Sequence, residues 1–174
     1  MKKNFLNITT QNWGLFLLLT FIFILRIPLL YQPIFDIDES VFGEFANKIL
    51  QGKTPYLDAI DNKPVLNYYF FAFIYAIFGK NSLIAMHFFT TLLVLLTGVF
   101  IYFASLKAKN WTTAMASLAS FILLAHAYEP KNISSNGETF CNIFFALVFV
   151  LYFYYRQQGK FQPYLFLLMG FLMG

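Results

Sequence analysis

Long apolar runs alternate with short polar segments along the chain. Four closed runs cover residues 13–30, 82–106, 111–128 and 139–155, and a fifth, 161–174, is still apolar where the sequence stops. A bilayer core about 30 Å thick needs roughly 20 mostly apolar helical residues. The pattern therefore predicts an all-α fold, a polytopic transmembrane helical bundle. We expect residues 1–174 to be the N-terminal part of a longer, truncated membrane domain.

The composition excludes the ordinary soluble classes. The chain is 59% apolar and 21% aromatic but only 11% charged, whereas soluble domains are about 25% charged. A cytosolic enzyme, a disordered tail and a disulfide scaffold are excluded, the last because Cys141 is the single cysteine. The net charge of +4 does not indicate nucleic-acid binding, since the basic residues flank the apolar runs.

The basic residues also orient the predicted spans. Short loops rich in Lys and Arg stay cytoplasmic, and three such pairs occur: Lys2 and Lys3, Lys107 and Lys109, Arg156 and Lys160. All three lie on one side only if the uncharged aromatic stretch 64–79 does not cross the membrane. We therefore favour an outer loop over 31–81 with juxtamembrane helices. If 64–79 does cross, the Lys107–Lys109 loop lies outside.

All eight acidic residues fall in two segments, which this topology places on the same, non-cytoplasmic side. They are Asp36, Asp38, Glu39, Glu44, Asp58 and Asp61 in the first segment, and Glu129 and Glu138 in the second. One interpretation is a cavity lined by carboxylates at the outer membrane surface. The other is that acids merely avoid the cytoplasmic loops, although Asp and Glu contribute little to orientation.

The first outer segment has a readable local pattern. Asp36 and Glu39 have the spacing of a capping box at a helix start. Apolar residues from Val41 to Leu50 recur at helical spacing, which predicts an amphipathic interfacial helix, and Gly52 is a typical stop after it.

Several charged residues also have simple structural interpretations. Asp36 fits a helix cap and Glu44 fits a solvated helix face. Arg26 can extend to the interface or neutralise an outer carboxylate, and both alternatives stay open. His87 and His126 lie inside predicted spans without the spacing of a metal site, so packing is the expected role for both.

An ordered set of short motifs resembles the first outer loop of the GT-C glycosyltransferases. It resembles most the branch containing protein O-mannosyltransferases and lipid A aminoarabinose transferases. The motifs are an Asp38-Glu39 pair just after the first span, Glu44 five positions beyond it, Lys63-Pro64 before an aromatic stretch, and Phe78-Gly79 at its end. Asn136-Gly137-Glu138 is similar to the second outer loop of that family.

The resemblance implies an enzyme that transfers a sugar from a polyprenyl-phosphate-linked donor to an acceptor at the non-cytoplasmic face of the plasma membrane. We expect residues 1–174 alone to be inactive, because they lack the family's remaining spans and C-terminal domain. Asp38 matches the catalytic aspartate, and Glu39 stands beside it as the second candidate catalytic residue. Lys63 matches the lysine that engages the donor phosphate, with Glu44 and Glu138 as further donor-binding candidates. No cofactor is implied with certainty. A divalent metal held by Asp38 and Glu138 is one option.

The main alternative is a non-catalytic polytopic membrane protein, such as a transporter of lipid-linked sugars or a scaffold subunit. Transporters place polar or broken-helix features near the membrane midplane, often with internal repeats. Here the polar chemistry gathers at one surface and no repeat is visible, which favours catalysis at the interface. The expected partners are the lipid bilayer, the lipid-linked donor and an acceptor that the sequence does not identify.

Overall fold

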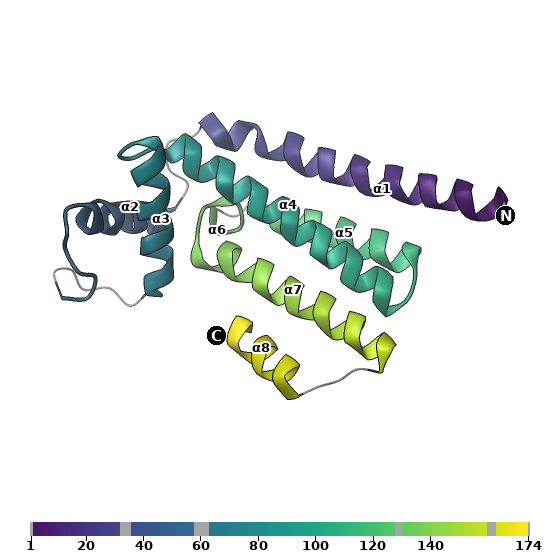
Figure 1. Ribbon diagram of the computed structural model, residues 1–174. Helices are drawn as coiled ribbons and strands as arrows, with labels where there is room; N and C mark the ends of the chain where they lie inside the picture. The colour runs from purple at the N-terminus through teal and green to yellow at the C-terminus, as the bar shows by residue number, and fades with distance from the viewer. Residues whose placement is uncertain (1, 32–35, 58–62, 128–129, 160–162, 174) are drawn as a thin grey trace.

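The computed structural model describes residues 2–31, 36–57, 63–127, 130–159 and 163–173, and every regular element in those ranges is helical. The elements are α1 (Lys2–Arg26), η1 (Pro28–Tyr31), α2 (Ile37–Leu50), α3 (Val65–Phe78), α4 (Leu83–Ala108), α5 (Trp111–Ala125), α6 (Pro130–Ile133), α7 (Gly137–Gln158) and α8 (Pro163–Met173). Figure 1 shows α1, α4, α5 and α7 running alongside one another, with the α2–α3 pair at one end.

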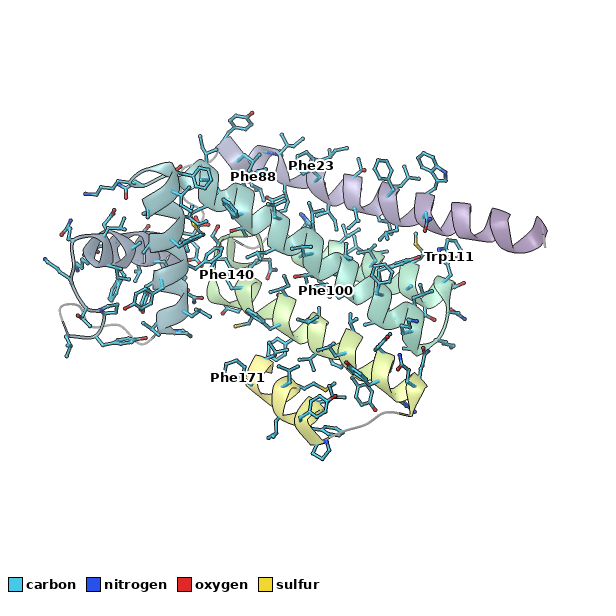
Figure 2. The ribbon with its side chains drawn as sticks, in the orientation of Figure 1. Phe23, Phe88, Phe100, Trp111, Phe140 and Phe171 are labelled. Carbon is cyan, nitrogen blue, oxygen red and sulfur yellow. The ribbon has the colours of Figure 1, made fainter. Side chains whose placement is uncertain are left out.

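Three helical segments are long and apolar enough to cross a membrane: Asn12–Tyr31, Leu83–Ala108 and Gly137–Gln158. They coincide with the expected runs 13–30, 82–106 and 139–155. The other two expected runs form shorter helices, because α5 ends at Ala125 after 15 residues and α8 has 11. At 1.5 Å per residue, α5 is about 22 Å long. Large apolar side chains such as Phe23 and Phe88 lie exposed on the bundle (Figure 2), as contact with lipid requires.

Helix α4 is the central helix of the bundle, since α1, α3, α5 and α7 all contact it. One apolar core joins α4 to α1 and α5 and consists of Ile22, Val94, Tyr102, Ala114, Leu118 and Ile122. Gly98 permits this close packing, because a Cβ atom there would lie 3.1 Å from Leu118 Cδ1 and 3.4 Å from Ile22 Cδ1.

The predicted amphipathic helix is present as α2, but its capping box does not form. The Asp36 side chain makes no cap hydrogen bond. The Glu39 carboxylate is buried and bonds elsewhere in the fold. The C-terminal stop is as expected: Gly52 has φ +79°, and its N–H donates to the Ile49 carbonyl at 2.9 Å.

Helices α2 and α3 pack through aromatic rings, which form the second core together with residues of α4 and α7. Phe45 stacks on Tyr68 with ring centroids 4.3 Å apart, and Phe42 contacts both Tyr68 and Phe71. Figure 1 shows α3 running across the direction of α4 and α7. The stretch expected at 64–79 is thus a separate 14-residue helix at the end of the bundle.

The close approach of α2 and α3 depends on Gly43. A Cβ atom at this position would lie 3.0 Å from the Tyr75 hydroxyl oxygen. Replacing a glycine inside a helix by alanine ordinarily gains about 1 kcal/mol through helix propensity. We expect Gly43→Ala to lose that gain through overpacking, and Tyr75→Phe to restore it by removing the obstructing oxygen. Reversible denaturation in mixed micelles measures both effects. Gly170→Ala in α8 is the control that keeps the gain, since nothing lies within 4 Å of its Cβ position. An equal gain in Gly43→Ala and Gly170→Ala would contradict this packing.

Candidate functional site

An ion pair joins the first turn of α2 to the segment before α3. The Lys63 ammonium donates to Asp38 Oδ2 at 2.8 Å. The Asp38 side chain is 20% exposed and that of Lys63 is 38% exposed, so both groups stay within reach of a ligand. A charge-assisted hydrogen bond of this length holds the two groups in a defined geometry.

Two tyrosines fix the backbone of Lys63. The hydroxyl groups of Tyr56 and Tyr68 both donate to the Lys63 carbonyl oxygen, Tyr68 at 3.2 Å. Tyr68 is fully buried and stacks on Phe45 of α2. The lysine is therefore positioned by the same aromatic core that joins α2 to α3.

The start of α7 comes close to the start of α3. Asn136 caps α7, because its side-chain oxygen accepts from the Thr139 N–H at 3.0 Å and from the Thr139 hydroxyl at 2.9 Å. A Cβ atom at Gly137 would lie 2.7 Å from Asn67 Nδ2, so a larger residue here would force the Asn67 side chain to shift. Glu138 follows in the first turn of α7, next to the residues that precede α3.

These contacts create one pocket of about 290 Å³, which we name the Asp38 pocket. Its lining residues come from α2, from the start of α3 and from α7: Asp38, Phe42, Lys63, Pro64, Asn67, Gly137, Glu138, Cys141, Asn142 and Phe145. Asp38, Lys63 and Glu138 are far apart in the sequence, and the structure brings them together here. The pocket offers an acid, an ammonium, a second acid and two side-chain amides.

Glu39 is next to Asp38 in the sequence, but its side chain lies in a different, buried environment. It is 1% exposed, and its Oε1 accepts from the Ser135 N–H at 2.6 Å and lies 3.2 Å from His87 Nε2. Ser135 is itself buried and its hydroxyl bonds to Thr90 of α4 at 2.7 Å. Glu39 therefore ties α2 to α4 and to the turn that precedes α7. Burial raises the pKa of Tyr75 on α3, and the negative charge of Glu39 adds to that increase.

Arg26, at the end of α1, completes this buried network. It is 1% exposed, and it donates to the Thr91 hydroxyl at 3.2 Å and to the Ile133 carbonyl at 2.9 Å. Its charge and that of Glu39 attract each other. Of the two alternatives for Arg26, its burial disfavours extension to the interface, and its attraction to Glu39 favours compensation of a carboxylate. We name Arg26, Glu39, His87 and Ser135 the buried clamp.

The remaining candidates lie outside the Asp38 pocket. Glu44 is 66% exposed and pairs with Lys48 at 2.7 Å along α2, so the structure does not bring it to Lys63. His126 caps α5, with Nδ1 2.9 Å from the Ile122 carbonyl oxygen. Among the described residues, no three His, Cys, Asp or Glu side chains form a group that could hold a metal ion. The expected acids Asp58, Asp61 and Glu129 lie outside the described residues.

Sequence reasoning missed several contributors to this region. Asn67 and Asn142 line the pocket, and Asn142 lies four positions after Glu138 on the same face of α7. That spacing was a usable signal. The sequence predicts only a packing role for His87, and its contact with Glu39 joins residues 48 positions apart, for which the sequence carries no signal.

Comparison of the chain with protein-family models, with curated proteins and with solved structures finds no match.

The buried clamp predicts a large difference between two glutamates of the same helix. Glu39→Ala leaves the Ser135 N–H without its acceptor and Arg26 without its compensating charge, so we expect a loss of about 3 kcal/mol in unfolding free energy. Glu44→Ala removes only an exposed pair and should cost about 0.5 kcal/mol or less. Denaturation in mixed micelles compares the two variants. Similar losses for both would mean that the clamp does not stabilise the fold.

Proposed function

We propose that the chain belongs to a glycosyltransferase that moves a sugar from a polyprenyl-phosphate-linked donor to an acceptor at the non-cytoplasmic face of the membrane. The observation that supports this most is the Asp38 pocket, which gathers Asp38, Lys63 and Glu138. These are the residues whose motifs resemble the GT-C glycosyltransferases. The proposal rests on that resemblance and on the chemistry of the pocket.

The pocket supplies the groups that the reaction needs. A Lys ammonium has three N–H donors, so Lys63 can bind a phosphate oxygen of the donor while it keeps its contact with Asp38. Its positive charge stabilises the negative charge that develops on the departing phosphate. Asp38, 2.8 Å away, then accepts the proton of the acceptor hydroxyl. A phosphate bound to Lys63 also compensates the positive charge of the lysine. The attraction between Lys63 and the Asp38 carboxylate then weakens, so the carboxylate is more available as a base.

The membrane arrangement is part of the proposal. We propose that the chain crosses the membrane several times and that the α2–α3 end faces the non-cytoplasmic side. Helix α3 is short and runs across the long helices (Figure 1), which suits a helix lying at the interface. A phosphate head can then enter the Asp38 pocket while its lipid tail stays in the bilayer.

The test of the function is release of polyprenyl phosphate from polyprenyl-phosphate-linked sugars. The full-length protein that contains residues 1–174 is reconstituted and incubated with a panel of such donors, and the freed lipid phosphate is quantified. A glycosyltransferase releases it in step with glycosylated product. A transporter moves the intact donor across sealed vesicles without release, and a scaffold does neither.

Asp38→Asn separates the proposed base from the binding function. We expect turnover to fall by about 10² to 10⁴, as for removal of a general base. Binding of decaprenyl phosphate should persist or tighten, because the competing negative charge beside Lys63 is gone. Polyprenyl phosphate release and equilibrium binding measure the two effects. Near wild-type turnover in this variant would show that Asp38 is not the base.

Lys63→Ala tests the phosphate contact. Loss of a hydrogen bond to a charged group costs about 1.5–3 kcal/mol, so decaprenyl phosphate should bind about 10- to 100-fold more weakly. Lys53→Ala is the matched control, an exposed lysine in the same polar segment that does not line the pocket. If both variants bind like wild type, Lys63 does not hold the phosphate.

A further inference from the structure

A second cavity adjoins the Asp38 pocket. It lies between α4, α5 and α7, measures about 370 Å³, and is lined at its deep end by Ile101, Phe121 and Phe149. We name it the lateral groove. It shares Glu138, Asn142 and Phe145 with the Asp38 pocket. A ligand in the lateral groove can therefore present its polar end to Asp38 and Lys63.

The depth of the lateral groove matches an apolar chain. Glu138 and Phe149 are 11 positions apart on α7, which is about 16 Å along a helix. That distance is about half of the membrane core. A water-soluble acceptor would leave this apolar part of the groove unfilled. A lipid fills it while its headgroup stays at the level of Glu138.

The mouth of the lateral groove indicates the kind of headgroup. Its polar side chains are Asn132, Glu138, Thr139 and Asn142, and none of the described lining residues is Lys or Arg. Glu138 repels an anionic headgroup, and the nearby cation, Lys63 of the Asp38 pocket, is engaged by Asp38 and by the phosphate of the proposed donor. Amides and a carboxylate are suitable hydrogen-bond partners for neutral hydroxyl groups. The mouth therefore suits a neutral, hydroxyl-bearing headgroup.

The donor has a separate apolar space on another face of α7. A cavity of about 270 Å³ adjoins Pro64, directly after Lys63, and is lined by Phe140, Phe144 and Phe171. Figure 2 shows Phe140 on the α3 side of α7 and Phe171 on α8. A phosphate at Lys63 thus has an apolar space for its lipid tail that shares Phe145 with the lateral groove, and the α4 and α5 side of the groove remains available.

We propose that the lateral groove holds the acceptor and that this acceptor is a neutral, hydroxyl-bearing lipid. This inference rests on the proposed function. The acceptor oxygen forms a bond to the anomeric carbon, and the bond from that carbon to the phosphate oxygen breaks. The electron pair leaves with the polyprenyl phosphate at Lys63, and the hydroxyl proton passes to the Asp38 carboxylate. Glu138, which lines both cavities, is a positioning residue for the acceptor headgroup.

Photo-crosslinking in lipid nanodiscs tests the lateral groove without requiring turnover. The probe is a monoglucosyl diacylglycerol with a diazirine in one acyl chain, compared with diazirine-bearing phosphatidylglycerol and diazirine-bearing decaprenyl phosphate. Labelled residues are mapped by mass spectrometry. We expect the glucosyl lipid to label the lining of the groove at least fivefold more than phosphatidylglycerol does. Preferential labelling of the groove by decaprenyl phosphate would overturn the assignment, because the groove would then hold the donor.

Two variants make the crosslinking decisive. Ala146→Phe fills the groove, since Ala146 is buried and lines it, while Ala116→Phe on the exposed face of α5 is the control. We expect labelling by the glucosyl lipid to fall at least fivefold in the first and to stay unchanged in the second. Asn142→Leu is the second test and leaves the groove open. Because Asn142 is exposed, this variant can be measured even if Ala146→Phe does not fold. It should abolish the preference for the glucosyl lipid, and unchanged preference in this variant would overturn the proposal.

Adding a polyprenyl-phosphate-linked sugar separates this inference from the proposed function. Both are supported if the glucosyl lipid gains a sugar as polyprenyl phosphate is released. If polyprenyl phosphate is released but the glucosyl lipid neither labels the groove nor gains a sugar, the acceptor assignment is wrong and the enzymatic function stands. If the lipid labels the groove and no donor is consumed, the proposed enzymatic function is wrong. The proposed role of the lipid as acceptor is then wrong as well.

Discussion

A single buried carboxylate holds the two polar segments of this apolar chain together. Glu39 is almost fully enclosed, accepts from the Ser135 N–H and contacts His87, and Arg26 supplies the opposite charge. Burying a carboxylate is costly unless it is bonded and compensated. Arrangements of α2, α4 and the turn before α7 that separate Glu39 from Ser135 and His87 would lose these contacts and are therefore disfavoured.

The clamp separates two neighbouring acids into different environments. Asp38 and Glu39 are consecutive on α2, so their side chains point about 100° apart. Glu39 faces the bundle and Asp38 faces the pocket with Lys63. Fixing Glu39 thereby fixes Asp38 relative to Glu138, which follows Ser135 by three positions. Structural support and candidate chemistry therefore share the same helical turn.

The sequence predicted the parts of this molecule that depend on local pattern. The helices at 13–30, 82–106 and 139–155, the amphipathic helix α2 and its stop at Gly52 all follow from hydrophobic spacing and backbone preference. The capping box did not form because Glu39 finds a stronger partner in Ser135, 96 positions away. Glu44 matched a motif by spacing, but its helix face points to solvent, where Lys48 pairs with it. Long-range partners of this kind leave no periodic signal.

Convergence of the two polar segments at the Asp38 pocket is the central claim, and disulfide formation between them measures it most directly. In a Cys141→Ser background, cysteines replace Asn67 and Gly137. A Cβ atom at position 137 would lie 3.8 Å from Asn67 Cγ, the atom whose place a cysteine sulfur takes. Asn67→Cys also removes the amide nitrogen that obstructs a side chain at position 137. Oxidation followed by peptide mass spectrometry reports the linkage. The account predicts that most of the protein forms the 67–137 disulfide within the chain. Two free thiols after oxidation would contradict it, because the starts of α3 and α7 would then be apart.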